Sequence, residues 1–200
     1  DIKEAIKKEV LFFLKNKSKL TKMSAVALSI TDGKGTQRLI SHINGFDFKL
    51  VSRKSTKNDI YTYFRWVNDS KVRNNSFKKN KISFKEHYQW FNKNLACRNS
   101  LLLIIQTEND LPVGQIRFEK DINRNLAKIS FSIDSFARGN GYGSKVLELG
   151  IIRLKENWPK LKEVYGEVEI FNNRSSRAFI KAGFNELESS NNKKIFSKKI

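Results

Sequence analysis

The first 45 residues show short helical patterns. Residues 2–16 place apolar side chains at helical spacing, which predicts an amphipathic helix. A second short segment over residues 24–30 and a helix over residues 36–43 flank a turn at residues 31–35. Such a piece is too small to hold a core of its own, and the chain opens with Asp rather than Met. We therefore expect residues 1–45 to be the end of a larger upstream domain.

The pattern changes to a mixed one from residue 46 onward. Residues 46–53 alternate like a strand, and a helix through Trp66 follows polar residues suited to an N-cap. Ser83 precedes a second helix over residues 84–95, with Glu86 as its capping-box partner. Both helices are amphipathic and should pack against a sheet.

Three strands follow, over residues 101–106, 113–119 and 126–133, with short polar turns between them. This spacing predicts an antiparallel meander. The remaining pattern is helix, strand, helix and two closing strands, with the first three elements over residues 143–157, 164–171 and 175–182. The predicted fold class is α+β, a mixed and mostly antiparallel sheet flanked by helices, occupying residues 46–200.

Composition limits the possible functions. Hydrophobic residues make up 39% of the 200 residues and include fifteen Phe, which is enough to fill a core. A single cysteine, Cys97, excludes an intrachain disulfide, and one cysteine with two histidines offers no metal-ligand cluster of the usual spacing. The apolar run at residues 10–14 is too short for a signal sequence or a membrane span. We expect a cytoplasmic protein without a metal.

The net charge of +19 raises the possibility of nucleic-acid binding, because clustered Lys and Arg neutralise phosphates. The basic residues are spread along the whole chain rather than gathered on one helix or arm, and no aromatic-rich binding signature accompanies them. Nucleic acid is therefore the less favoured partner. A polyanionic small ligand fits the charge equally well.

A glycine-rich loop lies between the strand ending at Ile133 and the next helix. Glycines let a backbone approach a ligand closely, and the first N–H groups of the following helix face outward with the positive end of the helix dipole. Pyrophosphate suits such a place, although most glycine loops are only turns. The candidate cofactor-binding residues are Ile133, Arg138, Gly139, Asn140, Gly141, Tyr142, Gly143 and Ser144.

Two nucleotide-binding motifs do not fit this loop. A Rossmann fingerprint needs G-x-G-x-x-G after the first strand of a βαβ unit, but here a meander precedes and the spacing is G-x-G-x-G. A P-loop needs Gly-Lys-Ser/Thr, and Ser144 and Lys145 stand in the wrong order.

The loop instead resembles that of the GNAT acetyltransferases, whose pyrophosphate loop reads Arg or Gln, two residues, Gly, one residue, Gly or Ala. Arg138, Gly141 and Gly143 match the fixed positions. A second element of that family, Asn followed by Ala or Ser and then by Gly-Phe, is similar to the set Asn172, Ser175, Gly183 and Phe184. The resemblance covers residues 46–200. It implies acetyl-CoA as cosubstrate, with Asn172 among the cofactor-binding residues, and acetyl transfer to an amine without a covalent enzyme intermediate.

The resemblance also implies catalytic roles. In related ribosomal-protein N-terminal acetyltransferases a Glu five residues before the motif Asn is the general base, and Glu167 holds that position. The alternative is that Glu167 only belongs to a solvated strand face. Glu119 is the second candidate for the general base. The position that often carries a proton-donating Tyr is Phe179, so Ser175, Tyr165 or water must supply the proton. Ser175 can equally be only the N-cap of its helix, and Cys97 reads as a packing residue.

The stretch over residues 64–91 contains the runs RWVND at 65–69, VR at 72–73 and HYQWF at 87–91. It resembles the acceptor-side helices of GNAT enzymes that acetylate the amino sugar in pseudaminic and related nonulosonic acid biosynthesis. This implies Arg65, Asn68 and His87 as substrate-binding residues and a UDP-linked 4-amino-4,6-dideoxy sugar as acceptor. In the structural alternative the nearby Trp66, Trp90 and Phe91 are core residues and His87 is a solvated helix residue. Protein N-termini or antibiotic amines are alternative acceptors, and a non-catalytic acetyl-CoA or nucleic-acid binding module is a further alternative.

The N-terminal piece carries a related signal. Residues 32–38 are similar to the C-terminal end of the nucleotide-sugar hydrolase of the same pathway. This implies that residues 1–45 are the C-terminal remnant of a glycosyltransferase-like domain fused upstream of the acetyltransferase.

Overall fold

The computed structural model describes residues 2–43, 49–121, 123–190 and 192–200. Within these ranges seven strands form one sheet in the order β1-β2-β3-β4-β5-β7-β6, antiparallel except for the β4–β5 pair. This confirms the predicted α+β class with a mixed, mostly antiparallel sheet. The strands are β1 (Leu50–Lys54), β2 (Ser100–Thr107), β3 (Pro112–Asp121), β4 (Leu126–Ile133), β5 (Glu163–Glu169), β6 (Asn185–Ser189) and β7 (Lys193–Lys199).

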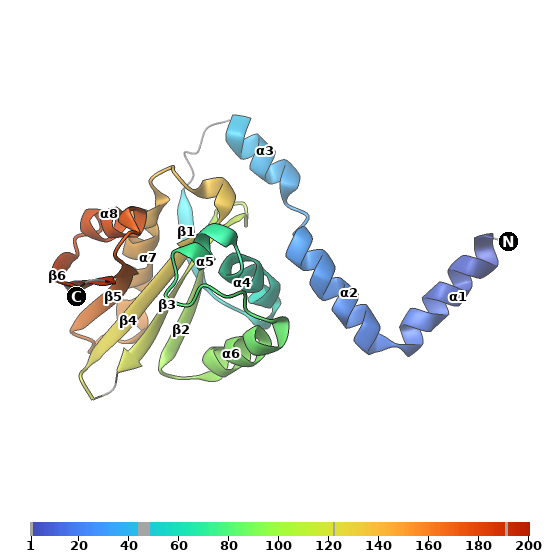
Figure 1. Cartoon of the computed structure of the whole chain (residues 1–200), viewed down its shortest axis with the longest axis horizontal. Helices are drawn as coiled ribbons and strands as arrows, with labels where there is room; N and C mark the ends of the chain where they lie inside the picture. Colours follow the sequence, from blue (N-terminus) through green and yellow to red (C-terminus); the bar gives the residue numbers. More distant parts are fainter. Residues whose placement is uncertain (1, 44–48, 122, 191) are drawn as a thin grey trace.

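Helices cover both faces of the sheet (Figure 1). Leu101, Leu103 and Ile105 of β2 pack in the cluster that includes α7 and α8, whereas Leu102 and Ile104 pack with α4 and α6. This alternation explains why β2 reads as a continuous apolar run. The helices are α1 (Ile2–Lys15), α2 (Lys17–Ile30), α3 (Gly35–Ile43), α4 (Ile60–Val67), α5 (Ser70–Asn74), α6 (Phe84–Ala96), α7 (Tyr142–Asn157) and α8 (Asn173–Lys181), with 3-10 turns at Lys57–Asp59 and Ser135–Ala137.

Most predicted elements are present with small shifts at their ends. Ser83 and Glu86 form the expected capping box of α6. Helix α2 is longer than the short segment expected, and α5 was not predicted. The strand expected over residues 46–53 is found as β1, and its first positions lie outside the described residues. No helix in the described part of the chain is long and apolar enough to cross a membrane.

The parallel pair β4–β5 separates halfway along its length. Hydrogen-bonded register runs from the pair Leu126–Glu163 to the pair Ile129–Gly166 and then ends, although both strands continue. Beyond these pairs, β4 and β5 therefore form no backbone hydrogen bonds with each other. An opening between two strands in the middle of a sheet offers a ligand backbone N–H and C=O groups.

The N-terminal helices extend away from the sheet (Figure 1). No residue of α1 is buried, and Ile2, Ile6 and Val10 of its apolar stripe are exposed. The turn after α2 does contact the domain: Asp32 binds Arg65 of α4 at 2.7 Å, and it also binds Arg38 of α3. Asp134, at the end of β4, accepts hydrogen bonds from Arg65 at 2.8 Å and from the Trp66 indole at 2.6 Å.

Candidate active site

The glycine loop has the backbone geometry of a ligand site. Gly139 and Gly141 have φ of 92° and 75°, which residues with a side chain rarely adopt, and Gly141 is the N-cap of α7. A Cβ on either glycine would meet no atom within 4 Å, so the space beside this backbone is open. The first N–H groups of α7 have no partner within the helix. The loop can therefore bind an anionic group through its backbone.

The loop's side chains mostly hold the loop itself. The Arg138 Nε donates to the Ile133 carbonyl at 2.9 Å, and its guanidinium lies 2.8 Å from the Asp69 carboxylate. Tyr142 is buried and packs with Val113 and Ala137. The Asn140 and Ser144 side chains bond loop carbonyl oxygens. Since their side chains contact other protein groups, Arg138, Asn140, Tyr142 and Ser144 offer a ligand mainly their backbone groups.

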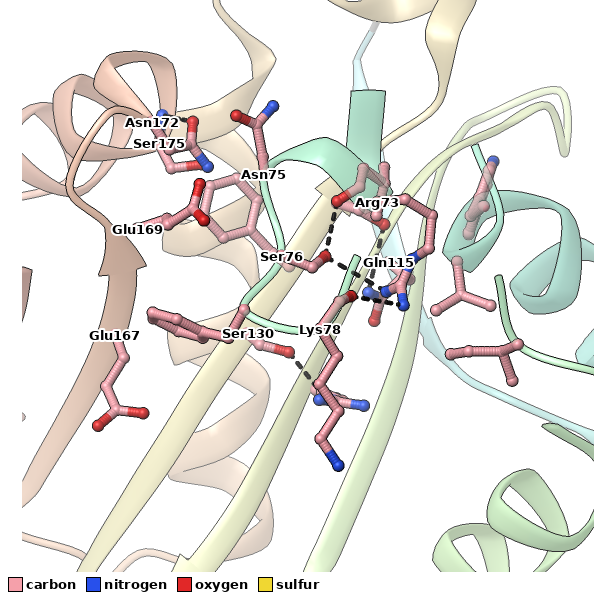
Figure 2. Close-up of a pocket in the computed structure, with 18 of the residues that line it drawn as sticks. Arg73, Asn75, Ser76, Lys78, Gln115, Ser130, Glu167, Glu169, Asn172 and Ser175 are labelled. Atoms are coloured by element: carbon pink, nitrogen blue, oxygen red, sulfur yellow. Dashed lines mark hydrogen bonds between the residues drawn. The ribbon is translucent and has the colours of Figure 1, made fainter. Parts of the chain in front are cut away.

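A cavity of about 790 Å³ lies beside the open end of the β4–β5 pair. Figure 2 shows Arg73, Ser76 and Lys78 on one side of it and Glu167, Glu169, Asn172 and Ser175 on the other. Its floor comes from β3, β4 and β5, and its roof from α5 and the segment that joins α5 to α6. The predicted residues Glu167, Asn172, Ser175 and His87 all line this cavity, whereas Arg65 and Asn68 do not.

Asn172 and Ser175 lie at the start of α8, on the wall of the cavity. The Asn172 side chain accepts a hydrogen bond from the Ser175 backbone N–H at 3.2 Å, so Asn172 is the N-cap of the helix. The alternative in which Ser175 is the N-cap is wrong, because Ser175 follows two residues inside the helix. Its hydroxyl remains available to a ligand in the cavity.

Glu167 is held between two lysines. Lys193 lies 2.8 Å from one carboxylate oxygen and Lys128 contacts the other. These two hydrogen bonds, the one from Lys128 first, hold the pKa of Glu167 below its usual range against the opposing effect of burial. Glu167 is therefore ionised at neutral pH and carries its charge at the edge of the cavity.

The three predicted substrate-binding residues have different surroundings. His87 is buried, bonds the Ile60 carbonyl through Nε2 at 2.9 Å and has its pKa lowered by burial. The expectation of a solvated His87 is wrong because the ring fills the space between α4 and α6. Arg65 binds Asp32 and Asp134. Asn68 bonds the backbone of Ile82 at 2.8 and 3.0 Å and thereby fixes the segment before α6.

The aromatic residues near the predicted substrate-binding residues belong to the core, as the structural alternative predicted. Trp66 and Phe91 are buried in the cluster between α4, α6 and β2, and Trp90 packs against it. Phe179 is also buried, its ring stacked on Phe196.

Several cavity residues were not singled out in the sequence. Gln115 and Arg117 of β3 face Ser132 and Ser130 of β4, with hydrogen bonds of 3.3 and 2.7 Å across the pair. Arg73 of α5, which belongs to the stretch that resembles the amino-sugar acetyltransferases, lines the same cavity. The signal was present as polar residues at every second position of two otherwise apolar strands, which marks one polar face.

The charged residues of the cavity lining are mostly basic. Its cationic residues outnumber its carboxylates, and two of the carboxylates, Glu167 and Glu169, are paired with lysines. The cationic lining residues are Arg73, Lys78, Lys79, Lys81, Arg117 and Lys128. Such a lining attracts anionic ligands and repels polycations. No group of His, Cys, Asp and Glu suited to a metal occurs among the described residues.

Comparison with known families decides what this arrangement is. Residues 49–185 match the model of the acetyltransferase (GNAT) domain, which is more than half of the chain. The chain belongs to the GNAT acetyltransferase family. A search of curated proteins found no significant match. Membership makes acetyl transfer from acetyl-CoA the chemistry of this domain.

Solved structures share the fold of this GNAT chain. A domain from Methanocaldococcus jannaschii matches at a TM-score of 0.66 and 22% identity, covering 77% of this chain and 100% of that one. The spermidine N-acetyltransferase of Vibrio cholerae, solved with CoA and spermine, matches at 0.67 and 15%, covering 75% and 95%. An aminoglycoside acetyltransferase, AAC(6')-Ib, solved with coenzyme A, matches at 0.64 and 17%, covering 76% and 95%. At these identities the likeness concerns the fold alone.

Proposed function

We propose that this GNAT domain transfers the acetyl group of acetyl-CoA to the amine of a nucleotide-linked amino sugar, of the UDP-4-amino-4,6-dideoxy type. The observation that carries the proposal is the basic lining of the cavity next to the open β4–β5 edge. A nucleotide sugar brings a negative diphosphate that this lining attracts. Such an acceptor belongs to the biosynthesis of surface polysaccharides or nonulosonic acids.

Acetyl-CoA binds, in this proposal, along the opening between β4 and β5. Its pyrophosphate lies on the N–H groups of Gly141, Gly143 and Ser144 at the start of α7. The two amides of its pantetheine arm can pair with the unladdered end of β4 beyond Ile129, as a peptide pairs with a strand edge. The thioester then reaches the cavity near Asn172, which completes the cofactor site.

Glu167 and Ser175 have the catalytic roles in this account. Glu167 accepts the proton of the acceptor ammonium, directly or through a water, because it is the ionised carboxylate at the strand opening. Ser175 donates a proton to the departing thiolate of CoA and takes up the second proton that the acceptor nitrogen loses, since its hydroxyl lines the same cavity and Phe179 has no proton to give. The attack on the thioester forms a C–N bond and breaks a C–S bond, and no covalent enzyme intermediate is needed.

The cavity charge favours this acceptor over the alternatives. Spermidine and aminoglycosides are polycations and would meet the same cluster of Arg and Lys side chains. A peptide N-terminus remains the principal alternative acceptor, and a module that binds acetyl-CoA or nucleic acid without catalysis is the further one. Retention of acetyl-CoA binding with no turnover of any amine would favour that further alternative.

The test is acetylation of the synthetic UDP-4-amino-4,6-dideoxy sugar, with mass spectrometry of the product. We expect an acetylated sugar whose formation requires both acetyl-CoA and the enzyme. Formation no faster than in buffer, while a peptide is acetylated, would overturn the acceptor and leave the cofactor assignment in place.

A further inference from the structure

Two half-buried arginines of the cavity carry guanidinium nitrogens that no carboxylate of the described chain satisfies. Arg73, on α5, lies more than 4.0 Å from every carboxylate of the described chain, and its contacts are to Ser76 and to the backbone carbonyls of Lys78 and Asn80. Its Nε is buried and donates no hydrogen bond. A buried cationic donor without a partner costs free energy unless a ligand satisfies it.

Arg117 reaches the same cavity from β3. Its Nε donates to the Ser130 hydroxyl at 2.7 Å, and its guanidinium lies over the Trp90 ring, 5.0 Å from the centroid. Within the described residues, the two terminal nitrogens of Arg117 donate no hydrogen bond. The Glu119 carboxylate lies 3.7 Å from the Arg117 Nε. The ring and the serine fix the guanidinium while leaving its outer edge free.

The two guanidinium groups act on each other. Arg73 and Arg117 line the same cavity, and no carboxylate of the described chain pairs with both of them. Burial first and the charge of Arg117 second lower the pKa of Arg73. Beside them the Gln115 side-chain oxygen is buried and accepts no hydrogen bond. Figure 2 shows Arg73 above Gln115, at the end of the cavity away from Glu167 and Ser175.

We propose that Arg73 and Arg117 bind a phosphate of the acceptor, with Gln115 accepting a hydrogen bond from an adjacent sugar hydroxyl. A guanidinium matches phosphate oxygens in a two-point geometry, and two such groups hold a diphosphate well. The reacting amine then lies toward Glu167, on the other side of the cavity. This assignment rests on the proposed function, because it defines the non-reacting end of the same acceptor.

The experiment measures two quantities on the full chain saturated with CoA, so that the cofactor's own pyrophosphate site is filled. The first is calorimetric binding of inorganic pyrophosphate. The second is KM for the UDP-linked amino sugar against KM for its methyl glycoside, which keeps the amine but lacks the diphosphate. The variants are Arg73→Gln, Arg117→Gln and Arg117→Lys, and the control is Arg98→Gln, which removes an exposed charge outside the cavity.

Loss of one charge-assisted contact should weaken pyrophosphate binding by roughly ten- to a hundredfold in Arg73→Gln and Arg117→Gln. The same variants should raise KM for the nucleotide sugar by a similar factor and leave KM for the methyl glycoside unchanged. Arg117→Lys should lie between, and Arg98→Gln should match the wild type. A merely structural role for Arg73 in holding the loop would raise both KM values together.

The possible failures are distinguishable. Pyrophosphate binding that is absent in the wild type, or unchanged in both glutamine variants, would overturn the phosphate site even if the sugar is acetylated. Arginine-dependent pyrophosphate binding in a protein that does not acetylate the sugar would support the phosphate site and overturn the proposed acceptor.

Discussion

Phe179 illustrates how one residue changes the expected proton donor. Its ring is buried, stacked on Phe196 with centroids 5.2 Å apart, and its tip lies over Gly166: a Cβ built on that glycine would be 2.4 Å from Cζ. Phe179 also lines the cavity, but a tyrosine hydroxyl would extend from a ring tip that already lies close to Gly166. We therefore expect the added hydroxyl to overpack this contact rather than to act as the proton donor.

We predict that Phe179→Tyr does not raise kcat and lowers the free energy of unfolding by about 1–3 kcal/mol, because the hydroxyl overpacks the core. Phe171→Tyr is the control: Phe171 is 83% exposed, so its change should stay within about 0.5 kcal/mol. Urea unfolding and steady-state rates measure both effects. A faster enzyme of unchanged stability would show that the hydroxyl reaches the thiolate after all.

Glu167→Gln should lower kcat by roughly 10²–10⁴-fold with little effect on acetyl-CoA binding, as expected for loss of a general base. Because two lysines lower the pKa of Glu167, the wild-type rate should show no titration of this carboxylate above pH 5. Glu148→Gln, an exposed change on α7, should leave kcat unaltered. If the rate of Glu167→Gln still falls as a carboxylate is protonated between pH 7 and pH 5, another residue is the general base.

At the scale of elements, an ion-pair network joins the N-terminal helices to the domain. Asp32 follows α2 and binds Arg38 of α3 and Arg65 of α4, and Arg65 also binds Asp134 at the end of β4. The glycine loop begins a few residues after Asp134, so the network supports the base of the cofactor site. Through Asp32, the turn after α2 is attached to α4 of the acetyltransferase domain.

The network makes stability depend on pH in a defined direction. Although burial opposes it, hydrogen bonds and the charges of Arg38 and Arg65 hold the pKa of Asp32 well below its usual range. A carboxylate with a lowered pKa stabilises the fold above its unfolded value of about 3.9 and loses that contribution as pH falls below it.

Asp32→Asn should therefore cost about 1–3 kcal/mol at pH 7, because it leaves Arg38 and Arg65 short of a partner. The deficit relative to the wild type should shrink at pH 3. Glu4→Gln, on the exposed α1, is the charge control and should cost nothing at either pH. Urea unfolding at the two pH values measures the difference, and an equal deficit at both would contradict the electrostatic account.

The elements of the acetyltransferase domain were largely predictable because periodicity and capping residues are local signals. The β4 strand matches its predicted bounds, and the Ser83 cap was read directly. The partners of Glu167 were not predictable, since Lys128 and Lys193 come from two other strands. The position of Arg73 in the cavity also depends on the tertiary packing that brings α5 near β3, which no local sequence pattern encodes.

The charge of the whole molecule fits its proposed chemistry. The net charge of +19 is spread over the chain, but the cavity gathers six cations around an acceptor site. Such a field raises the local concentration of anionic substrates, and salt weakens it at the exposed rim. The same field disfavours the polycationic acceptors of the structural relatives.

The most direct measurement is kcat/KM for acetyl transfer to the UDP-linked amino sugar, to spermidine and to an aminoglycoside, at low and high ionic strength. The account predicts the highest value for the nucleotide sugar, falling as salt is added, and little turnover of the two polycations. Faster acetylation of spermidine or the aminoglycoside, rising with charge on the acceptor, would contradict it.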